Sequence, residues 1–319
     1  MAEVLVAVKC PLCASKELKL ITNHLRFQKK ADVYRCVSCS LVFLDQNSFT
    51  FPKDFYEKEY HQTYITHVEP DALNPQVYFE KMKKSTKIWA DRFCEILTGN
   101  EVVLDVGCST GHFMDLVKGK TKKIYGHELS RVEVDFCQKN LGLDVSNEPL
   151  AKRFKPETFD YITMIFVLEH IAEPVSFLKE LKTFLKPNGK FVILVPNIQD
   201  ALVNFYDIDE FQKFYYCIEH LFYYEPKTLE LTLEKAGLTG KAEVIQEYPI
   251  TNHLQWAYKR GPSDVLVSRQ GIPNAAIKDS TLLDEWEGLW REFNQKYQKF
   301  LKSHGFGDRV WAVAKKSVR

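Results

Sequence analysis

The sequence predicts an α/β fold with a mainly parallel sheet, preceded by a small cysteine-bearing β module. Three observations predict it. Strand-like and helical segments alternate from residue 101 onward, two Cys-x-x-Cys pairs lie among short strands near the N-terminus, and a glycine loop follows the first strand of the alternating region. Alternation of strands with amphipathic helices is typical of βαβ units, whose strands lie parallel.

The chain has 319 residues, enough for two domains or for one large domain with an appendage. We expect the β module over residues 1–45, an irregular connector over 46–75 and the α/β domain over 76–319. Apolar residues make up 45% of the chain and charged residues 27%, which excludes wholesale disorder.

Hydrophobic periodicity places the elements of the α/β domain. Helical patterns lie at 75–97, 111–118, 130–141, 174–186 and 226–236, and strand-like runs at 101–106, 123–128, 159–166, 190–195, 242–248 and 309–316. Ser130 and Glu133 fit a capping box at one helix start. The Lys-Pro-Asn-Gly sequence at 186–189 predicts a turn.

An excursion over 249–307 separates the last two expected strands. It contains a long helical pattern at 282–302 with an apolar stripe. We expect this helix to pack on the core or on a second subunit, so a homodimer through it is one expected arrangement.

Charge and hydropathy narrow the class of protein. The longest apolar run, Ile162–Leu168, is interrupted by Thr163 and falls far short of the ~20 residues that a membrane-spanning helix needs. Glu3 stands where a signal peptide has positive charge, so we expect a cytoplasmic protein. The formal net charge is +1, which disfavours a nucleic-acid partner held by its phosphates.

Two identical cysteine spacings indicate a metal site. The segments CPLC and CVSC are separated by 22 residues and supply Cys10, Cys13, Cys36 and Cys39. Four thiolates in two tight turns form the tetrahedral set that structural Zn²⁺ prefers, with no open position for a catalytic water. Such a metal either replaces a core too small to fold alone or helps to recognise a ligand, and both roles stay open.

The loop after the first α/β strand is the strongest candidate for a ligand site. It reads DVGCSTG, with Asp105 at its start and glycines at Gly107 and Gly111 that allow a tight turn and close backbone approach. It has neither the P-loop sequence nor the dinucleotide G-x-G-x-x-G spacing. Glu128 ends the next strand, where an acid can accept both hydroxyl protons of a ribose.

At these residues the sequence resembles the class I S-adenosylmethionine-dependent methyltransferases. The resemblance rests on DVGCSTG, on HELS at 127–130 and on VLEHIAEP at 167–174, and it covers residues 75–250 plus the final strand. Ser109 replaces the middle glycine of the family loop. The family fold implied is a Rossmann-like seven-stranded sheet with an antiparallel last strand, here with a helical insertion before that strand, and the implied cofactor is S-adenosylmethionine.

The resemblance also implies a set of cofactor contacts. The methionine end would lie over the glycine loop, the ribose on Glu128, and the adenine between Leu129 and the 147–150 loop, with Tyr78 as a lid and Phe166 near the transferred methyl. The implied cofactor-binding residues are Tyr78, Asp105, Gly107, Cys108, Ser109, Gly111, Glu128, Leu129, Asn147, Pro149, Leu150 and Phe166.

Histidines are the candidate catalytic bases, because methylation of a hydroxyl requires that its proton be accepted. His170 follows the fourth strand, His220 lies in an aromatic-rich Glu-His-Leu segment, and His253 opens the excursion. Glu169 would border the methyl group. Each histidine could instead be a packing residue, and the aromatic residues of 205–224 could line a pocket or form core.

The four-cysteine front end joined to this core resembles bacterial methyltransferases of sugar and secondary-metabolite pathways. The expected reaction is methyl transfer to a small-molecule hydroxyl, that of a carbohydrate or nucleotide-linked sugar, in cell-surface polysaccharide or secondary-metabolite biosynthesis. Three alternatives stay open: a sugar C-methyltransferase, an rRNA or tRNA methyltransferase that uses its zinc module on RNA, and a non-catalytic zinc-ribbon scaffold.

Overall fold

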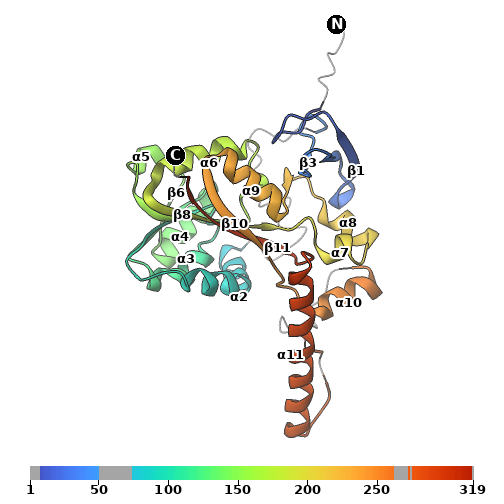
Figure 1. The fold of residues 1–319 in the computed structure, drawn as a ribbon. Coiled ribbons are helices and arrows are strands. Elements are labelled where there is room, and N and C mark those ends of the chain that lie inside the picture. Colours follow the sequence, from blue (N-terminus) through green and yellow to red (C-terminus); the bar gives the residue numbers. More distant parts are fainter. Residues whose placement is uncertain (1–7, 50–73, 262–271, 274, 318–319) are drawn as a thin grey trace.

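The protein folds around two sheets (Figure 1). The structure is a computed structural model and describes residues 8–49, 74–261, 272–273 and 275–317. The larger sheet has seven strands in the order β10-β11-β8-β7-β4-β5-β6. Its strands are β4 (Val102–Val106), β5 (Lys123–His127), β6 (Asp144–Ser146), β7 (Phe159–Ile165), β8 (Leu185–Pro196), β10 (Leu238–Ile245) and β11 (Arg309–Lys316).

The pairing of the large sheet confirms the expected Rossmann-like methyltransferase fold. Strands β6, β5, β4, β7 and β8 pair in parallel, whereas β11 runs antiparallel to both β8 and β10. Parallel strands place their carboxyl ends at one edge of the sheet, where open α/β sheets bind ligands. The site is therefore expected beyond the ends of β4, β5 and β7.

Helices cover both faces of the large sheet (Figure 1). Successive strand residues point to opposite faces, so Val103 joins a core with α2, α3 and α4, and Leu104 joins one with α6 and α9. The helices are α2 (Pro75–Cys94), α3 (His112–Val117), α4 (Arg131–Leu141), α5 (Leu150–Arg153), α6 (Pro174–Phe184), α7 (Ala201–Asn204), α8 (Asp209–Tyr215), α9 (Pro226–Lys235), α10 (Ile250–Lys259) and α11 (Ser280–Ser303), with short 3₁₀ segments η1 (Arg26–Gln28), η4 (Lys118–Lys120) and η5 (Leu168–His170). No described helix combines the length and apolar character needed to cross a lipid bilayer.

Three local predictions differ from the structure in their bounds or details. The strand expected at 242–248 is β10, which begins at Leu238 and ends at Ile245. The expected turn at 186–189 lies inside β8, where the register against β7 shifts and the extra residues form an irregularity. The side chain of Ser130 makes no capping bond, and the Glu133 carboxylate accepts a hydrogen bond from the Ser109 hydroxyl.

The N-terminal module is completed by the α/β domain. Strands β1 (Leu18–His24), β2 (Lys30–Cys36) and β3 (Val42–Leu44) form a sheet with β9 (Phe222–Tyr223), which pairs antiparallel with β3. One apolar cluster continues from Val33 and Val42 into Tyr223 and Leu168. The module is thus fused to the larger domain through both backbone pairing and core. The expected connector lies largely outside the described residues.

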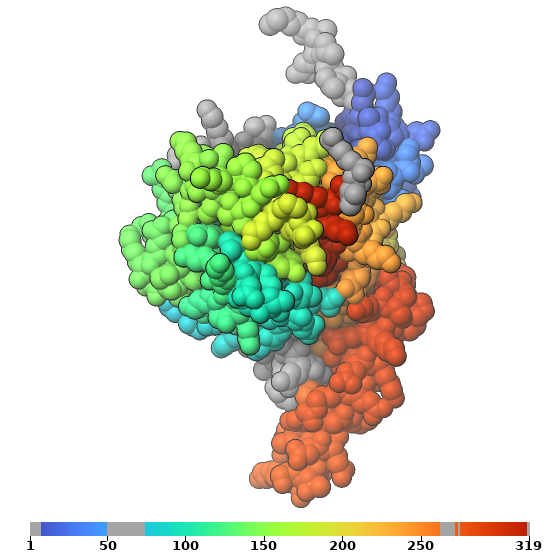
Figure 2. Space-filling view, turned by 60° about the vertical axis from the view of Figure 1, so that its left-hand side comes forward, coloured from blue at the N-terminus to red at the C-terminus, as the bar shows by residue number. Residues whose placement is uncertain are grey.

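Helix α11 extends away from the body of the molecule (Figures 1 and 2). Its 24 residues span about 36 Å, yet only Asn294 and Leu301 are buried. Leu289 is 62% exposed and Phe293 50% exposed, so the apolar stripe does not pack on the core along most of its length. Packing of this helix on a second subunit stays a prediction.

Asn197, which directly follows β8, is a structural residue. Its side chain is wholly buried and donates hydrogen bonds to the carbonyls of Gly305 and Gly307, at 3.1 and 2.6 Å, while its own oxygen accepts one from the Gln199 N–H at 3.1 Å. It ties the end of β8 to the turn that leads into β11.

Replacement of Asn197 by Ala should lower the free energy of unfolding by roughly 2–4 kcal/mol, because it leaves buried backbone groups without partners. Urea denaturation followed by circular dichroism measures this change. Asn188→Ala, at an exposed position of β8, is the matched control and should stay within about 0.5 kcal/mol of the parent. Equal effects of the two variants would contradict the assignment.

Candidate functional site

A cavity of about 680 Å³ lies at the carboxyl edge of the parallel strands. Gly107 after β4, Glu128 after β5 and Glu169 after β7 line it. Two further walls come from distant parts of the chain, with Arg26 from the N-terminal module and Trp256 from α10. Such a crevice beyond the strand ends is the usual ligand site of open α/β sheets.

The backbone of the glycine loop has positive φ angles and packs so closely that side chains at Gly107 and Gly111 would clash with neighbouring residues. Gly107 has a φ of +66°, and a Cβ there would lie 2.6 Å from Val167 Cγ2. Gly111 has a φ of +73°, and its Cβ would lie 2.6 Å from Leu143 Cδ1. Ser109 also has a positive φ, +49°, although it carries a side chain. The positive φ explains why glycine is favoured at position 109. In this chain the Ser109 hydroxyl donates a hydrogen bond to Glu133 at 2.7 Å, which offsets the cost of that backbone conformation.

Glu128 holds this loop against the next strand. Its carboxylate accepts the backbone N–H of Ser109 and the backbone N–H of Ser130, both at 2.9 Å. Burial and, secondly, the nearby Glu133 raise the pKa of Glu128 to about 7. The carboxylate lines the cavity, so it can also accept hydrogen bonds from a ligand.

Asp105 and Cys108 lie in the wall under the loop. Asp105 is 2% exposed and accepts a hydrogen bond from the Thr163 hydroxyl at 2.6 Å. Burial raises the pKa of Asp105 to about 7. The Cys108 thiol is buried and packs where Gly126 leaves room for it, since a Cβ at 126 would lie 2.7 Å from its sulfur.

Glu169, His170 and His220 come together in another part of the cavity wall. Their ligand atoms lie within 4.8 Å of one another, and the two imidazole rings meet edge to face at 4.9 Å between centroids. Burial lowers the pKa of both histidines to about 3, and the guanidinium groups of Arg26 and Arg309 lower that of His220 further. Both rings are therefore neutral at pH 7. The structure thus brings together three of the four predicted catalytic candidates.

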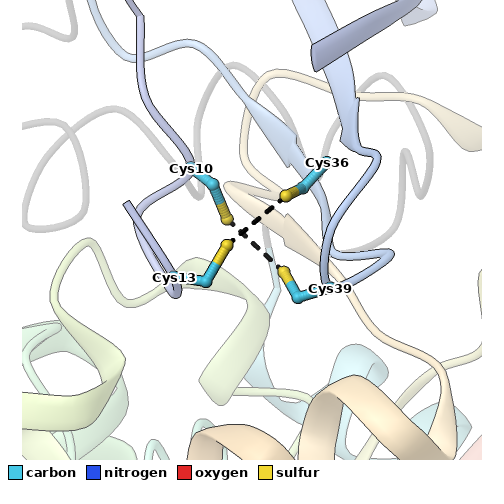
Figure 3. A group of neighbouring side chains, drawn as sticks. All are labelled: Cys10, Cys13, Cys36 and Cys39. Carbon is cyan, nitrogen blue, oxygen red and sulfur yellow. Dashed lines mark hydrogen bonds between the residues drawn. The ribbon is translucent and has the colours of Figure 1, made fainter. Parts of the chain in front are cut away.

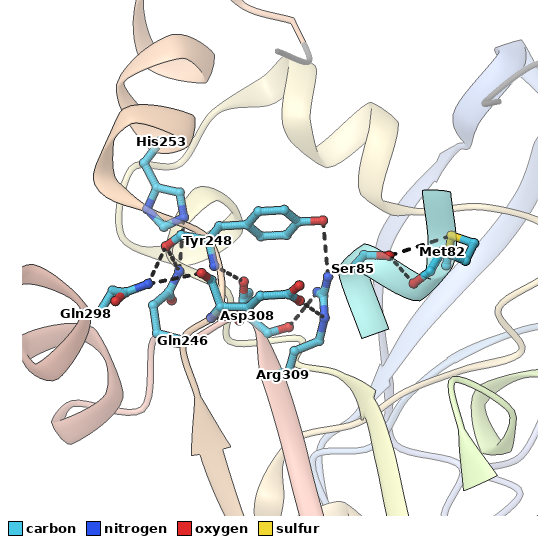
Figure 4. Close-up of polar contacts among 9 residues, drawn as sticks. Met82, Ser85, Gln246, Tyr248, His253, Gln298, Asp308 and Arg309 are labelled. Carbon is cyan, nitrogen blue, oxygen red and sulfur yellow. Dashed lines mark hydrogen bonds and ion pairs between the residues drawn. The ribbon is translucent and has the colours of Figure 1, made fainter. Parts of the chain in front are cut away.

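His253, the fourth candidate, does not line the cavity. Its side chain is wholly buried, and its Nδ1 lies 2.5 Å from the hydroxyl of Tyr297 on α11. Its Nε2 faces Gln246 at 3.5 Å (Figure 4). The histidine joins α10 to α11 away from the cavity lining.

Most of the predicted cofactor residues border the cavity. The lining includes Tyr78, Asp105, Gly107, Cys108, Ser109, Glu128, Leu129 and Phe166. It does not include Gly111, Asn147, Pro149 or Leu150. Gly111 instead packs the loop against Leu143, and Leu150 is buried in the core beneath α5. Their direct contact with a cofactor stays a prediction.

No motif in the sequence predicts several of the residues that form or support the cavity wall. Arg309 donates to the Tyr248 hydroxyl at 3.2 Å and to the Asp308 carbonyl at 3.0 Å, and the Asp308 carboxylate accepts the N–H groups of Glu247 and Tyr248 (Figure 4). These residues come from two separate segments that only the folded sheet brings together. The other unpredicted wall residues include His112, Phe177, Asp200, Asn252 and Trp256.

The N-terminal module also reaches the cavity. The guanidinium of Arg26 stacks on the Phe214 ring at 3.8 Å, and its Nε donates to the Phe214 carbonyl at 2.5 Å. Phe214 and Tyr215 line the cavity, whereas Tyr223 and Tyr224 are buried in core. Some residues of the aromatic-rich segment 205–224 therefore line the cavity and others form core, which are the two roles that its sequence allows.

The four cysteines of the module point their sulfur atoms toward a common centre (Figure 3). The sulfur atoms of Cys10 and Cys39 are 3.6 Å apart, and those of Cys13 and Cys36 are 3.5 Å apart. A tetrahedral zinc ion with Zn–S bonds of 2.3 Å requires about 3.8 Å between sulfurs. The donor set and spacing therefore fit a structural zinc ion.

Both cysteine pairs adopt the same turn. The residue after each pair, Ala14 or Ser40, has a positive φ, and its N–H bonds back to the carbonyl of the first cysteine of its pair at 2.8 or 2.9 Å. Two matching turns that face each other supply the four thiolates at the corners of one tetrahedron.

Comparisons with known proteins agree with this geometry. Over 101 residues the chain is 32% identical to the tRNA U34 carboxymethyltransferase of Nautilia profundicola, covering 30% of this chain and 34% of that protein. It is 24% identical over 164 residues to the demethylmenaquinone methyltransferase of Oceanobacillus iheyensis, covering 48% and 68% of the two chains. The first match thus spans about a third of that relative's length.

Among solved structures, the fold is similar to a SAM-dependent methyltransferase from Archaeoglobus fulgidus, with a TM-score of 0.49, 20% identity and coverage of 73% of this chain and 94% of that chain. The family model described as "Methyltransferase domain" matches residues 78–243, which is just over half of the 319 residues. The matched range contains the glycine loop, Glu128 and the cluster of Glu169, His170 and His220. The chain belongs to this family of methyltransferase domains.

Proposed function

We propose that the protein transfers the methyl group of S-adenosylmethionine to a hydroxyl of a small-molecule acceptor, a carbohydrate or a nucleotide-linked sugar. One observation carries the proposal. A single cavity is lined by a glycine loop and a buried carboxylate, which we assign to a donor end, and by Glu169, His170 and His220, which we assign to an acceptor end. A methyl transfer needs such a pair of sites, one for the donor and one for the acceptor, in line with each other.

The donor end fits the proposed cofactor. The left-handed glycine loop lets a ligand approach the backbone, and Glu128 can accept the two hydroxyl hydrogens of a ribose. Tyr78 and Leu129 line the same end. When bound, the cofactor supplies a methyl group made reactive by its sulfonium. The chain's own part is to hold that group, exclude water and orient the acceptor.

The acceptor end suits a hydroxylated molecule. His170 and His220 lie beside the buried Glu169 in the cavity wall, so these three residues are our candidates to position the acceptor hydroxyl and steer its proton. Phe214, Tyr215 and Trp256 add aromatic surface on which a sugar ring can pack. A place in polysaccharide or secondary-metabolite biosynthesis follows from the resemblance of the whole chain.

A hydroxylated aromatic ring is a second candidate acceptor. The same aromatic walls can stack on a planar ring, and a relative of 25% identity is named ubiquinone biosynthesis O-methyltransferase. Incubation of the protein with methyl-labelled cofactor and fractionated extract would show which class of compound gains the label. ¹³C NMR of the product then distinguishes a methoxyl group from a C-methyl group. Label found only in RNA would contradict the small-molecule proposal.

We further propose that residues 1–45 bind one structural zinc ion and form an accessory module, or annex, that packs on the methyltransferase domain at 76–319 and completes its cavity. The closed set of four thiolates leaves no position for a substrate. Pairing of β3 with β9 and the place of Arg26 in the cavity wall support an annex rather than a separate RNA-binding unit.

Glu128→Ala should weaken the binding of S-adenosylmethionine by roughly 1–3 kcal/mol, since a charged hydrogen-bond acceptor for the ligand is lost. Isothermal titration calorimetry measures the change. Glu234→Ala, an exposed carboxylate near the end of α9, is the matched control and should bind as the parent does. Unchanged affinity of the Glu128 variant would contradict the donor site.

Binding of S-adenosylhomocysteine should also depend on pH through Glu128. Ligand hydroxyls that donate to the carboxylate favour its ionised form, so binding below the pKa of about 7 must release a proton. Affinity should therefore be level above pH 7 and fall as the pH drops below it, by up to about tenfold per unit. Glu128→Gln should bind more weakly and lose this dependence, whereas the dependence from the ligand's own amine remains in both proteins.

Cys36→Ser should remove the metal and lower the free energy of unfolding by about 4 kcal/mol or more, as expected for loss of a structural ion. Metal analysis should find one zinc per chain in the parent protein. Cys94→Ser, a cysteine outside the cluster, should keep both the zinc and the stability. A parent protein that contains no zinc, or a variant with unchanged melting, would contradict a structural zinc site.

A further inference from the structure

Three side chains converge at the acceptor end of the cavity in an arrangement that goes beyond what steering a proton requires. Glu169 and His170 belong to η5 after β7, and His220 lies just before β9. Backbone bonds fix the two segments together, because the Leu221 N–H donates to the Glu169 carbonyl at 2.8 Å. The ligand atoms of the three side chains then lie within 4.8 Å of one another, and all three residues line the cavity.

Glu169 carries the main argument. Its side chain is 1% exposed, and neither carboxyl oxygen has a hydrogen-bond partner. No ion pair joins it to a lysine or arginine in the described part of the chain; Arg309 instead pairs with Glu247 at 3.6 Å. A buried carboxyl group without partners is costly. Here such a carboxyl group lies beside two imidazole rings and lines a cavity. This arrangement indicates that a bound group supplies the missing partner.

The orientation of His170 points to a cation as that group. Its Nδ1 lies 2.8 Å from the carbonyl oxygen of Glu219. A carbonyl can only accept, so Nδ1 carries the proton and the lone pair is on Nε2. Metal-binding histidines are held in this manner, with one nitrogen donating to a backbone carbonyl and the other serving as ligand.

We propose that Glu169, His170 and His220 bind one divalent metal ion at the acceptor end of the cavity. Two imidazole nitrogens and one carboxylate suit a first-row ion such as Mn²⁺, Fe²⁺, Co²⁺ or Zn²⁺. Three protein ligands leave positions open toward the cavity, in contrast to the closed four-cysteine cluster. The proposal rests on the function proposed above, in which this end of the cavity receives the acceptor.

The ion would act on the acceptor oxygen. A hydroxyl bound to it becomes more acidic and is held at a fixed point relative to the methyl donor. Arg26 and Arg309 also line the cavity and repel a cation, so the negative charge of Glu169 is required for binding. A carboxamide at position 169 keeps the shape of the side chain and removes this charge.

The test uses the full chain with zinc retained in its four-cysteine cluster. Mn²⁺ is titrated and followed by electron paramagnetic resonance, and Co²⁺ by its visible absorption. The parent should bind one added ion per chain, and Glu169→Gln and His220→Asn should each weaken this binding at least tenfold. Glu173→Gln and His304→Asn, exposed residues of the same types, are the matched controls and should bind as the parent does.

Melting temperature and S-adenosylhomocysteine affinity are measured on every variant. Weakened metal binding with both properties unchanged supports the site and excludes misfolding. If the parent binds neither Mn²⁺ nor Co²⁺ beyond its zinc, or if both site variants bind as the parent does, the metal proposal is overturned. In that case retained binding of S-adenosylhomocysteine leaves the proposed methyl transfer intact, whereas loss of cofactor binding in the parent would overturn that function as well.

Discussion

The carboxylate of Glu128 is the contact on which the glycine-loop wall of the cavity depends. It accepts one N–H from the loop after β4 and one from the residue that precedes α4, and it does so from the end of β5. A single side chain thus joins three consecutive elements of the βαβ unit. The loop is held in its left-handed conformation before any ligand arrives, so little of the binding free energy is spent on ordering it.

The fold could be predicted because its signals are local. Alternating strands and helices, the glycine loop and the terminal strand at 309–316 are each readable within a few residues, and the structure has β11 at these bounds. Local signals fail where a sheet imposes its own geometry. The Lys-Pro-Asn-Gly sequence at 186–189 favours a turn. In the structure β8 continues through these residues, and its register against β7 shifts there.

The candidate site could be predicted only in part, for the same reason. Asp105 lies near the carboxyl end of β4, and Glu128 and Glu169 follow β5 and β7, so their meeting at one edge follows from the fold. Arg26 and Arg309 come from opposite ends of the chain, and no pattern in the sequence relates them. The burial of His253 against α11 depends on where the excursion folds, which its own residues do not reveal.

Strand β9 has a consequence for biosynthesis. Translation proceeds from the N-terminus, so β1 to β3 leave the ribosome well before Phe222 and Tyr223, which complete their sheet. Until then the edge of β3 offers unpaired backbone groups to other nascent chains. A metal ion captured early by the four cysteines would keep this unfinished sheet in order while the remaining residues are made. The supply of that ion during translation, rather than in the finished protein, would then limit the yield of folded enzyme.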